Sequence, residues 1–187
     1  MHSIYQAAYF LITTLFNLYL SALFLRIILH WRRADYFNPL SQFIIKITSS
    51  VIKPIKKFVP EIKGIEISTI LVLLIIEVIK LFLLLAIAGI VPPIIIFLAQ
   101  LVADLASLIL NLYFYLIIAV VVTSWIAASQ YNSAIYLLSQ ITEPVLKLAR
   151  KIIPPIAGFD LSPIIVLIVI KLLDILVVMP LYQIGLN

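Results

Sequence analysis

Long runs of apolar residues alternate along the chain with shorter segments that hold most of the basic side chains. Four apolar runs stand out, at residues 5–29, 67–90, 95–127 and 161–186. Each is longer than the ~20 residues that a helix needs to cross a hydrocarbon core of ~30 Å. Lipid offers no hydrogen-bond partners to an open backbone, so the runs are predicted to be membrane-spanning α-helices. Pro92 and Pro93 predict a short turn between the second and third.

Composition supports a membrane protein and excludes several kinds of chemistry. The chain is 65% hydrophobic and 11% charged, whereas soluble domains are about half apolar and about a quarter charged. It contains no cysteine, which excludes disulfides, thiolate metal sites and a cysteine nucleophile. The four glycines are too scattered for a phosphate-binding loop. We therefore expect no cofactor and no metal ion, and nucleic acid is not directly indicated as a partner.

Positive charge is concentrated in the segments that follow the first and third runs. Short loops rich in Lys and Arg stay in the cytoplasm, so both basic segments are predicted to face inward. The N-terminus, the Pro92-Pro93 turn and the C-terminus carry no Lys or Arg and are expected outside. The basic segments hold ten of the thirteen Lys and Arg residues: Arg32, Arg33, Lys46, Lys53, Lys56, Lys57, Lys63, Lys147, Arg150 and Lys151.

The chain matches itself without gaps at an offset of 94 residues. Polar and aromatic matches carry this signal, because apolar matches alone are expected in any membrane protein. We therefore predict an all-α integral membrane protein in which four transmembrane helices form two parallel tandem repeats, residues 1–94 and 95–187. Each repeat consists of a span, a basic interfacial segment and a second span. The matches include Asn17/Asn111, Tyr19/Tyr113, Trp31/Trp125, Asn38/Asn132, Thr48/Thr142, Lys53/Lys147, Gly64/Gly158, Glu66/Asp160 and Ser68/Ser162.

Both basic segments have the pattern of an amphipathic helix lying in the membrane interface. Apolar residues recur every three or four positions from Leu40 to Phe58, and again from Leu138 to Ile152, where Thr142 is predicted as an N-cap. One interpretation is a patch that binds anionic lipid or an acidic partner. The other is that these charges only set the topology. The residues of this basic patch are Lys53, Lys56, Lys57, Lys147, Arg150 and Lys151.

A turn-and-cap motif precedes the fourth run. Gly158 is able to adopt a backbone angle closed to other residues, and Asp160 or Ser162 is predicted to cap the last helix, with Pro163 at its first position. Capping is favoured over a binding role. The first repeat has Glu66 at the equivalent position, so a weaker cap is expected there.

Four charges fall within the second and fourth runs. Glu77 and Lys80 stand three residues apart, and the repeat offset places them opposite Lys171 and Asp174 with reversed signs. Charges inside a membrane are costly and need partners. Two arrangements are open: separate pairs within each helix, or one intramembrane charge cluster in which Glu77 faces Lys171 and Lys80 faces Asp174.

Two blocks of the repeat carry a family resemblance. NPLSQFIIKITSSVIKPIKKFVP, which begins at Asn38, and ITEPVLKLARKIIPPIAGFDLSP, which begins at Ile141, resemble the YggT family of bacterial inner-membrane proteins. The resemblance covers nearly the whole chain. It implies a multi-span protein of the cell inner membrane, associated with osmotic or salt-stress tolerance and ion homeostasis. In the related YlmG proteins it implies membrane-protein assembly or nucleoid organisation.

The function expected from this resemblance is a non-enzymatic one. We expect a protein that supports osmotic-stress tolerance, either by modulating ion flux or by assisting proteins that do so. The alternative is a scaffold or assembly factor whose basic cytoplasmic face organises lipids or partner proteins. Expected partners are membrane lipids, anionic ones in particular, and a second copy or another membrane protein is left open. An intramembrane enzyme is disfavoured, because no set of catalytic side chains at a plausible spacing can be named.

Overall fold

A computed structural model describes residues 2–62, 64–126, 132–154 and 160–184. Regular structure in these ranges is helical, apart from one β-bridge between Ile62 and Ile65. The first repeat contains α1 (His2–Trp31), α2 (Pro39–Lys56) and α3 (Ile67–Ala88). The second contains α4 (Ile94–Ile126), α5 (Ser133–Ile152), α6 (Ser162–Leu173), the π-helical turn η1 (Asp174–Val178) and α7 (Met179–Gln183).

Four helical stretches of the described chain are long and apolar enough to cross a membrane. They are Ser3–Trp31, Ile67–Ala88, Ile94–Ser124 and Ser162–Gln183, the last of which runs through α6, η1 and α7. These stretches confirm the four predicted spans. α3 ends at Gly89, whose φ of 68° lies in the left-handed region that glycine adopts without strain. The chain then turns at Pro92-Pro93 into α4, as predicted.

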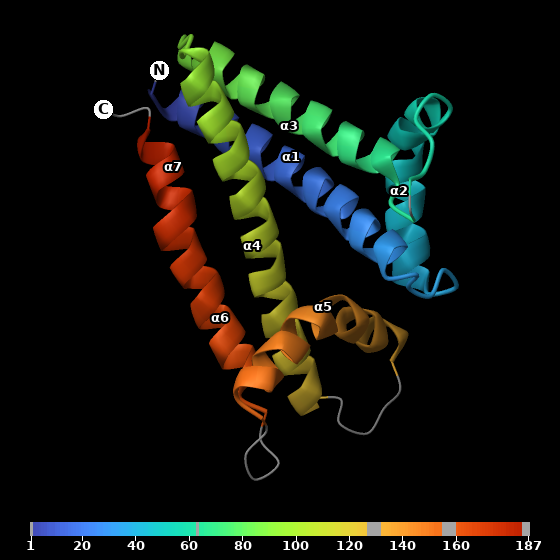
Figure 1. Cartoon of the computed structure of the whole chain (residues 1–187). Helices are drawn as coiled ribbons and strands as arrows, with labels where there is room; N and C mark the ends of the chain where they lie inside the picture. Colours follow the sequence, from blue (N-terminus) through green and yellow to red (C-terminus); the bar gives the residue numbers. More distant parts are fainter. Residues whose placement is uncertain (1, 63, 127–131, 155–159, 185–187) are drawn as a thin grey trace.

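α2 and α5 lie across the ends of the spans (Figure 1). Each begins after a repeat-equivalent asparagine: the side chain of Asn38 accepts a hydrogen bond from the N–H of Leu40, and that of Asn132 accepts one from Ala134. The prediction that Thr142 is an N-cap was wrong, because α5 already begins at Ser133. Thr142 instead lies fully buried inside α5 and donates its hydroxyl hydrogen to the carbonyl of Leu138.

The faces of α2 follow the predicted amphipathic pattern in part. Leu40, Val51 and Phe58 of the apolar stripe are exposed, so they are free to enter lipid. The face that packs against α1 and α3 centres on Thr48 and Ile52, both fully buried.

The two repeats meet through α4 and through the interfacial helices. α4 packs against both α1 and α3, while α2 packs against α5. At the interfacial contact the side-chain N–H of Asn38 donates to the carbonyl of Ser133 over 2.6 Å. The apolar core of the first repeat includes Leu108 of α4 beside the fully buried Leu20 and Leu23 of α1. The repeats therefore share buried surface within the membrane and at its edge.

The fourth span contains a wide turn. In η1 the N–H of Met179 donates to the carbonyl of Asp174, five residues earlier. Pro180 follows at once; it has no N–H to continue an α-helical ladder, and its ring crowds the carbonyl four residues before it. The wide turn shifts the register of α7 relative to α6, which matters for the position of Tyr182.

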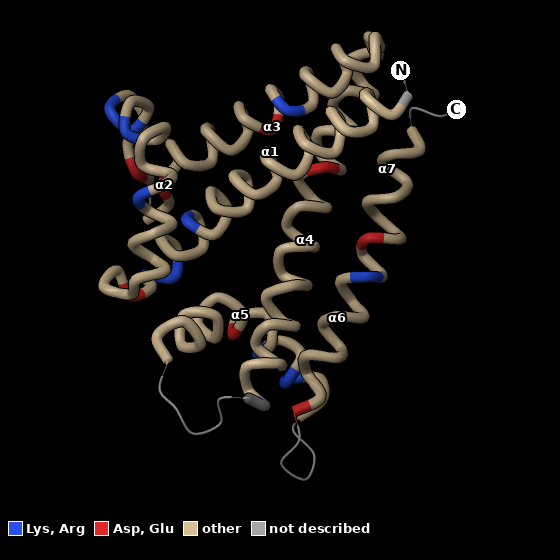
Figure 2. Tube along the Cα trace, turned by 180° about the vertical axis from the view of Figure 1, so that it is seen from behind, with Lys and Arg blue, Asp and Glu red and all other residues tan. Residues whose placement is uncertain are grey.

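Charge is distributed unequally between the two ends of the molecule. The two termini lie at the same end (Figure 1). Most Lys and Arg residues gather at the opposite end, around α2 and where α5 leads into α6 (Figure 2). Parallel repeats of two spans each place equivalent segments on one side of the membrane, and this arrangement has that form.

Candidate functional site

A cavity of about 800 Å³ opens among α1, α3, α4 and α7, within the length of the spans. On α1 its lining runs from Tyr9 to Ser21, so it extends from mid-span toward the end that carries the termini. Polar side chains are frequent in it, although its surroundings are apolar. The polar lining residues are Tyr9, Thr13, Thr14, Asn17, Ser21, Lys80, Asp104, Ser107, Asn111, Tyr115 and Tyr182.

Lys80 is the basic residue at the centre of this membrane cavity. Its side chain is only 4% exposed, and three oxygen atoms surround Nζ: Glu77 Oε1 at 2.7 Å, Asn17 Oδ1 at 3.1 Å and Asp104 Oδ2 at 3.2 Å. Glu77 and Lys80 share a face of α3 because they are three residues apart. Lys80 is eight residues from the end of α3 at Ala88, which is roughly 12 Å along the helix and too deep for easy contact with bulk water.

Asp104 joins this lysine to the fourth span. Its Oδ1 accepts a hydrogen bond of 2.6 Å from the hydroxyl of Tyr182, while its Oδ2 faces Lys80. Asp104 belongs to α4 and Tyr182 to α7, so the carboxylate links three spans from both repeats. The register shift at η1 precedes Tyr182 and helps set the direction in which its side chain leaves α7.

Repeat-equivalent residues face each other across the membrane cavity. Asn17 and Thr13 line it from α1, while Asn111 and Ser107, each 94 positions later, line it from α4. The contacts of the two asparagines differ: the oxygen of Asn17 accepts from Lys80, whereas the amide of Asn111 donates to the carbonyl and the hydroxyl of Ser107. The cavity therefore lies between symmetric walls that carry asymmetric charge.

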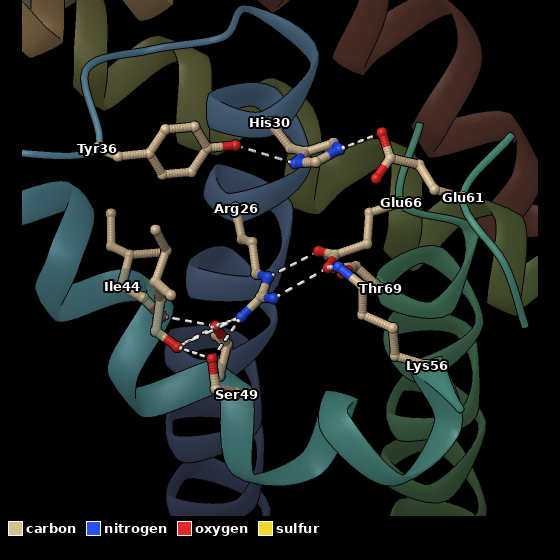
Figure 3. A network of polar contacts seen from close by, with 11 residues as sticks. Arg26, His30, Tyr36, Ile44, Ser49, Lys56, Glu61, Glu66 and Thr69 are labelled. Carbon is tan, nitrogen blue, oxygen red and sulfur yellow. Dashed lines mark hydrogen bonds and ion pairs between the residues drawn. The ribbon is translucent and has the colours of Figure 1, made fainter. Parts of the chain in front are cut away.

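A second polar site lies at the basic end of the first repeat (Figure 3). It is a small cavity of about 150 Å³ whose lining includes Arg26, His30, Lys56 and Glu66. Along α1, Ser21 of the large cavity and Arg26 of the small one are only five positions apart. The fully buried Leu23 lies in that interval and packs with Val72 and Leu73 of α3. An apolar layer therefore separates the two polar sites.

Glu66 is the centre of the small site. Both its oxygens receive the guanidinium of Arg26, at 2.8 and 3.0 Å, and Oε1 also receives Lys56 at 2.8 Å. The hydroxyl of Thr69 donates to Oε2. Burial alone would raise the pKa of Glu66, but these hydrogen bonds and the charge of Arg26 outweigh it and lower the pKa to about 2. The carboxylate is held by side chains rather than capping α3, in agreement with the weaker cap expected there.

The second repeat contains an equivalent ion pair, but its first span, α4, contributes no arginine to it. Lys56 with Glu66 corresponds to Arg150 with Asp160, whose side chains meet at 2.9 Å. Burial opposes ionisation of Asp160, but hydrogen bonds from Ser162 and Arg150 lower its pKa below the usual range. Arg150 also binds Glu143. Position 120, which corresponds to Arg26, is a valine, so α4 sends no guanidinium into this site.

Near the start of α6, Asp160 Oδ1 accepts a hydrogen bond from the N–H of Ser162, the first residue of the helix. The residue directly before α6 is Leu161, whose side chain forms no capping hydrogen bond. Pro163 is the second residue of α6, one position later than predicted, and Ser162 is the fully buried first residue. Gly158 lies outside the described residues. Its equivalent Gly64 has a φ of 77°, the left-handed conformation that was expected of such a glycine.

The hypothesis that Glu77 faces Lys171 and Lys80 faces Asp174 was wrong. Lys171 lies 3.8 Å from Asp174 in its own span, and its ammonium stands over the ring of Phe114. Glu77 and Lys80 likewise pair within α3. The four residues thus form two pairs rather than one cluster, because α3 meets the second repeat along α4.

Two members of the basic patch form ion pairs within the protein, although Lys56 itself is exposed. Lys56 binds Glu66, and Arg150 binds Glu143 and Asp160. The other four are exposed and form no ion pair with the described residues: Lys53, Lys57, Lys147 and Lys151.

Sequence reasoning missed Asp104, Tyr182 and the role of Arg26 in the small site. Asp104 is the only charged residue in the third apolar run, which was a usable signal because such residues mark functional sites in membranes. The repeat comparison passed over it, since the equivalent position holds Phe10. Tyr182 gave no signal, because its position depends on the turn at η1.

The side chains at these sites are suited to binding charged species. No three His, Asp or Glu side chains in the described ranges are placed to bind a metal ion. The polar groups of the membrane cavity are an ammonium, a carboxylate, amides and hydroxyls, a set suited to binding ions and water in a low-dielectric region.

The relatives of the chain have matching lengths and weak but extensive similarity. An uncharacterized protein of Pseudomonas aeruginosa is 36% identical over 92% of this chain and 88% of its own length. The protein YggT of Escherichia coli strain K12 is 33% identical over 88% of this chain and 86% of its own. A protein of Vibrio alginolyticus is 39% identical over 85% of this chain and 86% of its own length. No solved structure matches the chain.

The sequence profile of one family matches the chain twice. The description of this family is CCB3/YggT, and the two matches cover residues 5–87 and 99–181. Their starting points differ by the same 94 residues as the internal repeat. Each match contains two spans and the interfacial helix between them, so the chain belongs to the CCB3/YggT family.

Proposed function

We propose that this protein supports ion homeostasis under osmotic or salt stress by modulating ion flux across the cell inner membrane, with both termini outside and the basic helices in the cytoplasm. The membrane cavity around Lys80 and Asp104 is the observation that carries the proposal. A purely structural charge pair would be sealed from its surroundings. Asp104 instead lines a cavity of about 800 Å³ together with amides and hydroxyls.

The apolar layer gives this proposal a mechanism of control. Leu23 of α1 is fully buried and packs with Val72 of α3, between the membrane cavity and the small site at the basic end. Apolar constrictions close ion paths by excluding water. In this arrangement an ion has access to the cavity but not to the basic side. Flux then requires α1 and α3 to separate at this layer.

Flux through purified protein in liposomes tests the proposal. Vesicles loaded with potassium and diluted into sodium or choline salt report cation movement through a potential-sensitive dye. The proposal predicts a protein-dependent flux that increases in Leu23→Ser, because a hydroxyl wets the apolar layer. Leu148→Ser is the matched control, since Leu148 is 62% exposed on α5 and distant from this layer. Wild-type and Leu23→Ser vesicles that are no leakier than protein-free ones would reject flux as the function.

A scaffold that binds anionic lipid is the second candidate, and the exposed side chains at the end of α2 and directly after it favour this role. Lys53 and Lys57 are exposed beside the apolar Val51 and Phe58, the combination that draws an amphipathic helix to a charged leaflet. The test is retention of anionic phospholipid by purified protein. Lys53→Gln/Lys57→Gln should retain less lipid, and salt should weaken retention by wild type. Lys171→Gln, which lies in a span, is the control. Equal retention by all three proteins would reject a lipid role for these side chains.

A further inference from the structure

The charges around the membrane cavity do not balance. Lys80 contacts two carboxylates, Glu77 on its own helix and Asp104 on α4. The two carboxylates are also close enough to repel each other. With all three groups ionised the triad holds a charge of −1, in a region where an uncompensated charge costs at least several kcal/mol. The other intramembrane pair, Lys171 with Asp174, is balanced.

Lys80 offers little to an anion. An ammonium has three N–H donors, and three protein oxygens already lie within 3.2 Å of Nζ. The carboxylate of Asp104 differs, because each of its oxygens faces one donor of the described chain, Tyr182 or Lys80, and so retains capacity to interact with a further donor or cation. The free coordination capacity of the site, like its net charge, suits a positive species.

We propose that Asp104 binds one unit of positive charge from the membrane cavity, delivered either as an alkali cation or as a proton. Asp104 rather than Glu77 is the point of entry, because its side chain is 18% exposed and lines the cavity, whereas that of Glu77 is 0% exposed. Binding brings the triad to neutrality. This inference rests on the proposed function and names the ionic species that its site accepts.

The surroundings of Asp104 fit this role. The charged or titratable groups that face it are Glu77 and Lys80 from α3 and Tyr182 from α7, with Tyr9 from α1 close to Tyr182. Hydroxyl and amide oxygens of Ser107 and Asn111 also line the cavity on the helix that carries Asp104. Oxygen ligands of this kind suit hard cations. A proton would need only the Asp104 carboxylate itself.

Two measurements on the purified protein test whether Asp104 binds a positive charge. The first is the thermal unfolding midpoint in sodium, potassium or choline chloride at one ionic strength, where choline is too large for a single carboxylate site. An alkali cation a few times above its Kd should raise the midpoint by roughly 2–4 °C for a chain of this size. The second is the infrared C=O stretch of a protonated carboxyl group at neutral pH, which reports a bound proton.

Three variants make these measurements decisive. Asp104→Asn and Glu77→Gln each remove one acid and leave a balanced pair with Lys80, so each should abolish whichever signal the wild type shows. Asp174→Asn, in the balanced pair of the fourth span, should retain it. Asp104→Asn and Glu77→Gln have the same expected outcome, so the test still gives a result if one of them fails to fold.

The outcomes separate the two sources of charge and also the two proposals. A sodium or potassium shift identifies a cation, and a protonated-carboxyl band identifies a proton. A wild type that shows neither signal, or Asp104→Asn that keeps the wild-type signal, would overturn the inference. If the protein shows either signal but carries no ion flux, the binding site at Asp104 stands and the proposed function is rejected. Flux without either signal would reject the site alone.

Discussion

The ammonium of Lys80 lies 3.2 Å from the carboxylate of Asp104, and the two residues belong to different repeats. The position equivalent to Asp104 in the first repeat holds Phe10, so this ion pair has no counterpart there. It adds a charged contact to the apolar cluster of Leu108 with Leu20 and Leu23, which also joins the repeats. The polar cavity thus contains a contact that departs from the repeat pattern.

The Glu66 site predicts a loss of stability in acid. Its pKa is about 2 in the folded protein against 4.5 as the ordinary value. A carboxylate whose pKa is lowered by folding stabilises the native state above its unfolded pKa, and this stabilisation disappears as pH falls toward the folded value. The unfolding midpoint in detergent should thus fall between pH 4.5 and 2. Glu66→Gln should start lower and show a smaller decline; an identical decline would contradict this account.

The equivalent ion pairs of the two repeats should differ in their contribution to stability. Glu66 is 3% exposed and binds Arg26 as well as Lys56, whereas Asp160 is 33% exposed and faces Arg150. Removal of one partner from a buried pair costs about 3–5 kcal/mol, while exposed pairs contribute about 0–1 kcal/mol. Chemical unfolding should therefore show a larger loss for Glu66→Gln than for Asp160→Asn. Equal losses would mean that Arg26 does not distinguish the two sites.

The spans, the repeat and the interfacial helices were all predictable from the sequence. Apolar runs of membrane length and an ungapped offset carry that information directly. The start of α5 was misplaced because Thr142 and Pro144 resemble a helix start, whereas Asn132 caps the helix ten residues earlier. A proline within an amphipathic helix gave a local signal, and the packing of α5 against α4 and α6 outweighed it.

The site was predictable only in part. Lys80 was identified as a charge that needs a partner, but the partner depends on which helices meet. Reversed signs at Lys171 and Asp174 suggested that α3 faces α6; in the structure α4 packs between them and supplies Asp104. Tyr182 could not be placed from sequence, because the π-helical turn before it breaks the α-helical register. Long-range packing determines both the partner of Lys80 and the position of Tyr182.

The orientation in the membrane is open to a direct test. The native chain has no cysteine, so single cysteines report their own accessibility. Ser50 is exposed on α2, and Val91 is 96% exposed in the turn between α3 and α4. An impermeant thiol reagent applied to cells with a permeabilised outer membrane should label Val91→Cys but not Ser50→Cys, since basic loops stay inside. The reverse labelling would place both termini in the cytoplasm.

The measurement that tests the central claim most directly is a charge exchange between the repeats. Lys80→Asp leaves three acids together, and Asp104→Lys leaves one acid with two bases, so each should lower the free energy of unfolding by about 3–5 kcal/mol. Lys53→Asp changes the charge equally at an exposed position and should cost under about 1 kcal/mol. If Lys80 and Asp104 join the repeats, the double variant Lys80→Asp/Asp104→Lys should recover more than half of the summed loss. A double variant whose loss equals the sum of the two single losses would show that this contact does not hold the repeats together.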